Sequence, residues 1–194
     1  MTAAARLVAR IVAVVSAALV MSCASSPQHA AALPPGFPDL NSFTPVVVDD
    51  GYFMQLREGT SRLVNFSTPY DIVCNFYGGE QPVTAPSQGI DCNGDFPGMD
   101  SYPWPGGVPA RPGDCVLGEV QAAGAAYQFH RSAYAGCDGN PPTLPYGGKP
   151  LGVGQKLSYQ NVTCAVGPDR LVACLDTTSG QHGFVLKPSG SVAF

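Results

Sequence analysis

Apolar and polar positions alternate with a period of two along much of the chain. The segments 62–67 (RLVNFS), 70–77 (YDIVCNFY) and 125–132 (AAYQFHRS) show this alternation, and 44–50 (TPVVVDD) is rich in β-branched residues. Such alternation is typical of strands that bury one face. No long segment of the sequence has the 3.6-residue period of an amphipathic helix. The pattern therefore predicts a mainly β protein.

Two β-hairpins are predicted in the last part of the sequence. The strand-like segments 161–166 (NVTCAV) and 170–176 (RLVACLD) flank a short loop of Gly, Pro and Asp, and 182–187 (HGFVLK) is joined to 191–194 (SVAF) by PSG. A short helix is compatible with 51–57 or 116–123, although 116–123 also suits a strand. We expect a small antiparallel sandwich or a barrel-like sheet.

Long loops rich in Pro and Gly separate these segments. The chain holds 23 glycines and 19 prolines among 194 residues, and many of them fall in 96–114 and 138–154. Loops of this length without regular structure are often functional. They are therefore the first places to search for a binding surface.

The first 23 residues have the three parts of a secretory signal. Arg6 and Arg10 give a positive start, 11–21 is apolar, and small residues follow. The apolar run is too short for a membrane-spanning helix, which needs roughly 20 residues. We expect 1–23 to be a signal peptide, 24–38 a tether rich in Pro and Ala, and 39–194 a single domain.

Two kinds of cleavage compete at the end of this signal. The segment 20–23 (VMSC) resembles a bacterial lipobox, which predicts a lipid on Cys23 and a protein held at the cell surface. The segments 22–24 (SCA) and 30–32 (AAA) fit an ordinary signal-peptidase site, which would release an extracellular protein. Contact with a membrane is expected only through a lipid at Cys23.

The charge of the chain argues against a nucleic-acid partner. The formal net charge is −4, and only 12% of the residues are charged. A nucleic-acid-binding domain carries a basic patch or stripe, and the sequence contains none.

Six of the seven cysteines are expected to form disulfides. Cys23 belongs to the signal, and an even number of cysteines in an exported chain is typical of a disulfide framework. Six cysteines allow 15 connectivities. Cys164 and Cys174 face each other in the predicted hairpin, at a separation that suits a disulfide. Pairing of nearest neighbours then predicts the bonds Cys74–Cys92, Cys115–Cys137 and Cys164–Cys174.

Several motifs resemble one group of proteins. They are FSTPYDIVCNF, IDCNGDFPG, CVLGEV, LPYGG and the closing segment VTCAVGPDRLVACLDTTSGQHGFVLKPSGSVAF, and together they span roughly 43–194. They are similar to small exported proteins and lipoproteins of mycobacteria and related actinobacteria. The closing G-x-G-F of that group is slightly expanded here, to GQHGF at 180–184. The resemblance implies export, three sequential disulfides and an envelope location, and it implies no activity.

No catalytic residue is predicted. Only His130 and His182 stand in the expected domain, and the sequence has no G-x-S-x-G motif. His182 suits a hydrogen bond to a turn, and His130 suits a surface position on a strand. Fourteen acidic residues leave room for a carboxylate pair of the kind that glycoside hydrolases use, but the sequence singles none out.

No metal or cofactor is predicted either. Asp91, Asn93 and Asp95 alternate as at the start of a calcium loop, but Phe96 stands where that loop needs Gly, and Tyr102 where it needs Glu. The simpler interpretation is a turn beside a disulfide.

Aromatic residues in the loops are the best binding candidates. Tyr102 and Trp104 lie between prolines in 101–105 (SYPWP), and Tyr146 lies in LPYGG. Rigid aromatic side chains with a polar group suit recognition of sugars or peptides. Alternatively, Trp104 folds back and holds its loop against the core.

The sequence thus predicts an exported cell-envelope protein. Its expected role is non-catalytic binding or scaffolding outside the membrane, with an envelope component or a protein as partner. The alternative is a hydrolase that acts on envelope polymers.

Overall fold

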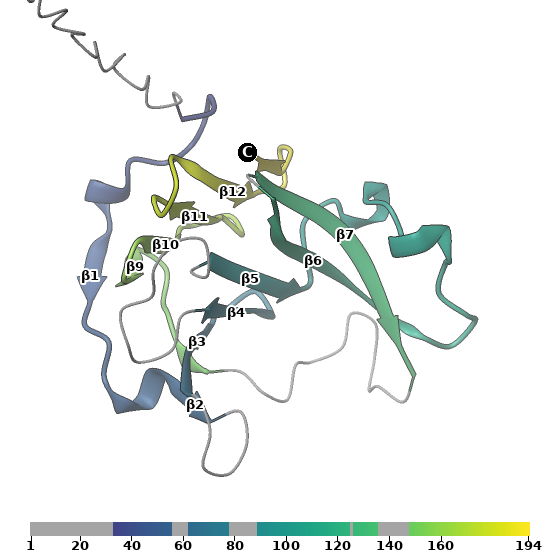
Figure 1. Ribbon diagram of the computed structural model, residues 1–194, viewed down its shortest axis with the longest axis horizontal. Coiled ribbons are helices and arrows are strands. Elements are labelled where there is room, and N and C mark those ends of the chain that lie inside the picture. Colours follow the sequence, from purple (N-terminus) through teal and green to yellow (C-terminus); the bar gives the residue numbers. More distant parts are fainter. Residues whose placement is uncertain (1–32, 56–61, 78–88, 125, 136–147) are drawn as a thin grey trace, which may run out of the picture.

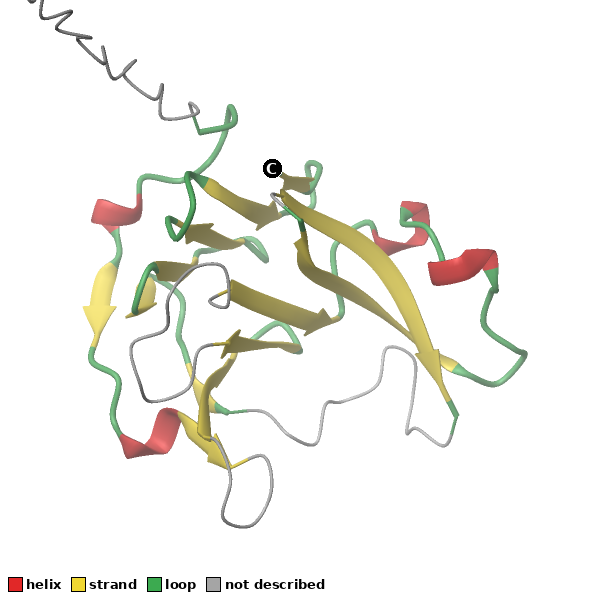
Figure 2. Ribbon diagram, viewed as in Figure 1, coloured by secondary structure: helices red, strands yellow, loops and turns green. Residues whose placement is uncertain are grey.

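Two β-sheets make up the protein (Figures 1 and 2). The computed structural model describes residues 33–55, 62–77, 89–124, 126–135 and 148–194. The first sheet has six strands in the order β1 (Thr44–Val46), β9 (Gln155–Tyr159), β10 (Val162–Val166), β11 (Val172–Asp176), β12 (His182–Leu186) and β13 (Val192–Ala193). Its strands pair antiparallel except β1, which runs parallel to β9.

The second sheet is built from the middle of the chain. Its order is β2 (Phe53–Gln55), β3 (Arg62–Ser67), β4 (Ile72–Tyr77), β5 (Gly89–Gly94), β6 (Cys115–Ala123) and β7 (Ala126–Tyr134), and β8 (Lys149–Pro150) pairs parallel with β3. It is called the seven-stranded sheet below.

The expectation of a mainly β fold is confirmed. The helices in the described ranges are single 3₁₀ turns, η1 (Leu40–Ser42), η2 (Asp50–Tyr52), η3 (Met99–Ser101) and η4 (Pro105–Gly107). The ambiguous segment 116–123 is a strand, because it pairs along its whole length with β7. The segment around Asp91, which the sequence suggested to be a turn, is strand β5.

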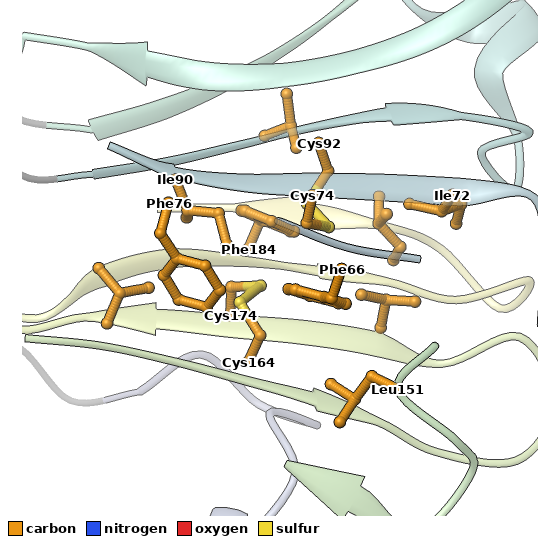
Figure 3. Close-up of a cluster of buried hydrophobic side chains, with 14 of the residues drawn as sticks. Phe66, Ile72, Cys74, Phe76, Ile90, Cys92, Leu151, Cys164, Cys174 and Phe184 are labelled. Atoms are coloured by element: carbon orange, nitrogen blue, oxygen red, sulfur yellow. A yellow bond between two sulfur atoms is a disulfide. The ribbon is translucent and has the colours of Figure 1, made fainter. Parts of the chain in front are cut away.

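The two sheets face each other across an aromatic and aliphatic core (Figure 3). Phe184 of the six-stranded sheet contacts Tyr127 and Phe129 of the other sheet, with ring centroids 5.7 and 6.4 Å apart. At the far side of the core, Phe76 lies edge-on to Tyr159 at 6.0 Å. Burial of these side chains is the main stabilising contribution to the fold.

Each sheet holds one disulfide in this core. Cys74 of β4 lies directly opposite Cys92 of β5, and Cys164 of β10 directly opposite Cys174 of β11; both pairs have Cα atoms 4.1 Å apart. These two predicted bonds are confirmed, and disulfides of this kind are typical of oxidising compartments. Cys137 lies outside the described residues, so its bond to Cys115 stays a prediction.

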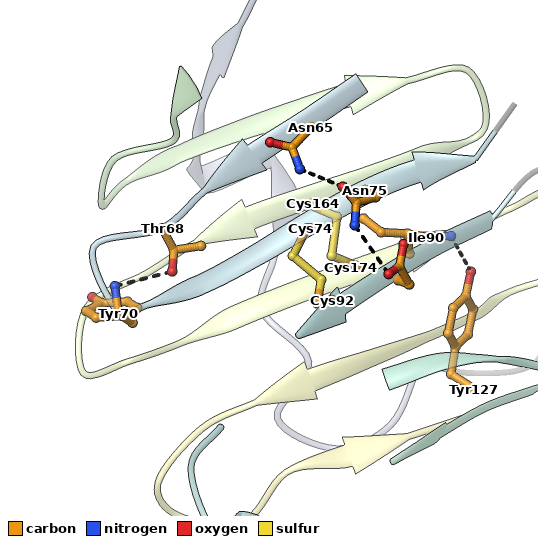
Figure 4. The surroundings of a disulfide bond; sticks show 11 residues. Asn65, Thr68, Tyr70, Cys74, Asn75, Ile90, Cys92, Tyr127, Cys164 and Cys174 are labelled. Carbon is orange, nitrogen blue, oxygen red and sulfur yellow. Dashed lines mark hydrogen bonds between the residues drawn. A yellow bond between two sulfur atoms is a disulfide. The ribbon is translucent and has the colours of Figure 1, made fainter. Parts of the chain in front are cut away.

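A buried polar contact joins the sheets. The Tyr127 hydroxyl donates to Asp176 Oδ2 at 2.8 Å. It also accepts the Ile90 N–H at 3.2 Å (Figure 4). Asp176 Oδ1 accepts the Thr178 N–H, so both carboxylate oxygens are bonded. Burial, and then the charge of Asp176, raises the pKa of Tyr127 above its ordinary value, which keeps the hydroxyl protonated as a donor.

The N-terminal part of the described chain crosses the outer face of the six-stranded sheet. Phe37 packs edge-on against Phe194 at 5.7 Å, and Lys156 Nζ donates to the Leu40 carbonyl at 2.8 Å. Ala165 and Ala173 lie on the same outer face and are fully buried. This face is therefore covered, whereas the outer face of the seven-stranded sheet carries the groove described below.

Tyr127→Phe tests the contact between the sheets. The change leaves a buried carboxylate oxygen and the Ile90 N–H without their partner, so we expect a loss of about 1–3 kcal/mol in unfolding free energy. Denaturant unfolding of the disulfide-intact protein measures it. Ser158→Ala, which removes an exposed hydroxyl, is the control and should stay within ~0.5 kcal/mol. A similarly small loss for Tyr127→Phe would contradict the assigned role.

Candidate functional site

Polar side chains form two rows across the outer face of the seven-stranded sheet. Successive residues of a strand point to opposite faces, so the residues between the core positions of β3 to β7 point outward. Strand register sets these outward residues opposite one another. One row contains Asn65, Asn75 and Asp91, with Gln121 and Gln128 on the next strands; the other contains Asn93, Glu119 and His130.

The first row is joined by hydrogen bonds (Figure 4). Asn65 Nδ2 donates to Asn75 Oδ1 at 2.5 Å, and Asn75 Nδ2 donates to Asp91 Oδ2 at 3.3 Å. The side-chain oxygen of Asn65, Oδ1, and the second carboxylate oxygen of Asp91, also Oδ1, are buried and have no hydrogen-bond partner in the described part of the chain. Asn65 Oδ1 lies against the backbone of Gly148, where a side chain would not fit. This row is only half satisfied, in contrast to the Tyr127–Asp176 contact.

Burial determines the protonation behaviour of this row. Burial raises the pKa of the Asp91 carboxyl above its ordinary value, and hydrogen bonds from Asn75 and Tyr77 oppose that rise. The charge of Glu119 raises it further. Burial, followed by the charge of Asp91, also raises the pKa of Tyr77 to about 12. The two carboxylates therefore act on each other across neighbouring strands.

The second row contains an ion pair. His130 Nε2 and Glu119 Oε2 lie 2.7 Å apart, and both side chains are partly buried. They stand directly opposite each other on β6 and β7. The sequence suggested a plain surface position for His130, and it gave no indication of this partner.

A groove of about 490 Å³ lies over these rows. Its polar lining includes Asn75, Asn93 and Glu119, and its apolar lining includes Leu117 and Tyr134. Sites for small ligands combine an apolar surface with a few placed polar groups, in volumes of roughly 300–1,000 Å³. The groove has this size and this mixture.

Trp104 lies at the edge of the same face. It lines a second hollow of about 300 Å³ together with Gln121, Gln128 and His130. The guanidinium carbon of Arg131 lies 4.5 Å from the centre of the Trp104 ring. Glu119 lines the groove and its partner His130 lines the second hollow. The Glu119–His130 pair therefore lies between the groove and this hollow.

The other predicted site residues are placed differently. Tyr102 is buried, stacks on Phe129 at 5.0 Å and donates to the Pro97 carbonyl, so the structure does not bring it to the surface beside Trp104. Tyr146 and Cys23 lie outside the described residues. Asp95 binds Arg170 at 2.6 Å. Within the described ranges, no three His, Cys, Asp or Glu side chains gather to hold a metal.

Comparisons with family models, curated proteins and solved structures find no match for this chain. Among the described residues, no helix has the length and hydropathy required to cross a membrane.

Asp91→Asn tests how much the buried Asp91 carboxyl lowers the free energy of unfolding. The raised pKa means that the folded state favours the protonated form, so ionisation of Asp91 at neutral pH destabilises the fold. We expect Asp91→Asn to be more stable than the wild type at pH 7, by about 1 kcal/mol. The difference should begin to shrink as the pH falls below the raised pKa of the folded state, and it should vanish once the pH lies below the ordinary carboxyl value of 3.8, where the folded and unfolded wild type are both neutral at Asp91.

Denaturant unfolding at a series of pH values measures this difference. Asp169→Asn, in an exposed turn, is the matched control for the replacement of a carboxyl by an amide. A loss of stability in Asp91→Asn at neutral pH would show that the Asp91 charge is compensated.

Proposed function

We propose that this chain is an exported cell-envelope protein that works outside the cytoplasm as a non-catalytic binding domain. Its ligand lies in the groove on the seven-stranded sheet. The observation that carries the proposal is the lining of that groove, where three amides and the Glu119 carboxylate stand in rows beside apolar residues.

The chemistry of the rows favours binding over a purely structural role. A sheet face that only needs covering uses apolar residues, because a buried polar group without full hydrogen bonding costs about 1–3 kcal/mol. Asn65 and Asp91 each retain an unpaired buried oxygen. Such a cost is consistent with groups kept for a ligand, since functional sites often retain locally unfavourable features.

Three features support the proposed location. The signal-like N-terminus and the buried disulfides fit an exported chain. The motifs similar to exported mycobacterial proteins support an envelope location. Lipidation at Cys23 would hold the protein at the surface, and cleavage elsewhere would release it.

A hydrolase of envelope polymers is the second candidate. The observation that favours it is the pair Asp91 and Glu119, which lie on neighbouring strands of one face and act on each other electrostatically. Glycoside hydrolysis uses one carboxyl of raised pKa as an acid and one ionised carboxylate. The contact with His130, however, occupies a Glu119 oxygen that would have to act.

Intact mass tests the proposed export. The protein should be recovered from the envelope or the medium of the producing cell without its first residues, and reduction should add six hydrogens for three disulfides. A mass that begins at Cys23 with acyl chains supports the anchor, and a later start without lipid supports release. An uncleaved chain in the cytoplasm would contradict export.

Co-sedimentation with insoluble cell-wall material of the producing cell tests the binding site. Asn93→Ala removes an amide that lines the groove, so we expect a fivefold to tenfold weaker association, about the loss of one hydrogen-bonding group. Asn161→Ala removes an amide from an exposed turn and is the matched control. Equal binding by both variants would contradict a site in the groove.

The same mixtures of protein and cell-wall material distinguish a binding protein from a hydrolase. Binding alone releases no product, whereas a hydrolase would release new reducing ends or peptides from the wall material. That release would have to be lost in Glu119→Gln.

A further inference from the structure

We propose that the ligand is a neutral saccharide chain, one ring of which stacks on Trp104 in the hollow beside the groove. The inference rests on the proposed function, because it assigns a ligand class to the same face. The hollow and the groove are separated by the Glu119–His130 pair, so a chain molecule that crosses this pair would occupy both.

Trp104 is held in place before any ligand arrives. Pro103 and Pro105 flank it and line the same hollow, and the Pro103 carbonyl accepts the Arg131 N–H at 2.9 Å. This bond ties the loop to the edge of β7, and the Arg131 guanidinium lies against the indole ring. A fixed aromatic ring contributes contact area at little entropic cost. The apolar C–H face of a sugar ring fits such a surface.

The amides beside Trp104 match sugar hydroxyls. Gln121 and Gln128 stand directly opposite each other on β6 and β7, and both side chains are exposed. A side-chain amide carries both donors and an acceptor, and a hydroxyl group likewise donates and accepts. Two neighbouring amides can therefore bind two neighbouring hydroxyls of one ring.

The charge of the face favours a neutral ligand. Among the described residues, no Lys or Arg lines the groove or the hollow, and the nearby Arg131 guanidinium lies against the Trp104 ring. Asp91 and Glu119 lie on this face. An anionic polymer would be repelled by the carboxylates. The Glu119 carboxylate is already paired with His130, which weakens its attraction for a cation.

The spacing of the rows suits a repeating chain. Outward residues on neighbouring strands recur every ~4.8 Å across a sheet, which is close to the length of one sugar unit in an extended chain. Asn93, Glu119 and His130 stand on three successive strands. A saccharide that lies across the strands would meet a new polar side chain at each unit.

The single tryptophan makes the test direct. Trp104 is the only Trp in the chain, so intrinsic tryptophan fluorescence reports on the surroundings of this one side chain. The disulfide-intact full chain is titrated with neutral oligosaccharides of glucose, mannose, galactose and arabinose, each six units long, and with a proline-rich peptide of the same length. We expect at least one sugar to produce a saturating shift in emission, and the peptide to produce none.

Variants locate the site. In calorimetric titrations with the sugar that binds, Gln128→Ala and Trp104→Phe should weaken binding about fivefold to tenfold, as loss of a hydrogen-bonding group or of stacking area predicts. Val153→Ala changes an exposed residue that lines neither the groove nor a hollow beside Trp104, and it should bind like the wild type.

The outcomes separate this inference from the proposed function. One outcome is that a sugar binds and Asn93→Ala weakens its binding, while Trp104→Phe has no effect and the fluorescence does not change. This outcome would overturn the Trp104 subsite but not the binding site in the groove. Cell-wall binding without binding of any sugar, or saturable binding of the peptide, would overturn the saccharide. Absence of both sugar and cell-wall binding would overturn the proposed function as well.

Discussion

The Cys74–Cys92 disulfide fixes the strand register on which the candidate site depends. The two cysteines lie directly opposite each other in the core, and the next residue along each strand gives the pair Asn75 and Asp91 on the outer face. A slip of one residue would turn the core residues outward and the polar row inward. The bond therefore holds the core and the row together, and Cys164–Cys174 imposes the same constraint on the opposite sheet.

Two buried polar networks of the protein differ in how completely they are hydrogen-bonded. Tyr127 and Asp176 join the sheets, and their buried oxygens are all bonded, as a structural contact requires. The row from Asn65 to Asp91 is also buried, yet two of its oxygens have no partner in the described part of the chain. The row from Asn65 to Asp91 therefore has unused hydrogen-bond acceptors, whereas the oxygens of Tyr127 and Asp176 are all in use.

The sequence predicts the local features of this molecule and misses the features that join distant segments. The β class, the strand 62–67 and two disulfides follow from periodicity and short spacings. The polar rows do not, because they require the register of five strands, and a long loop separates β5 from β6. Residue type alone identified Tyr102 and Trp104 as candidates. The structure shows that Tyr102 is the buried one, because its ring stacks on Phe129.

The path of the N-terminal segment makes the two outer faces of the sandwich unequal. Phe37 and Leu40 lie across the outer face of the six-stranded sheet. The groove lies on the outer face of the other sheet, with the core between the two faces. One outer face is therefore covered by the chain's own N-terminal segment, and the other presents the polar rows on which the proposed site rests.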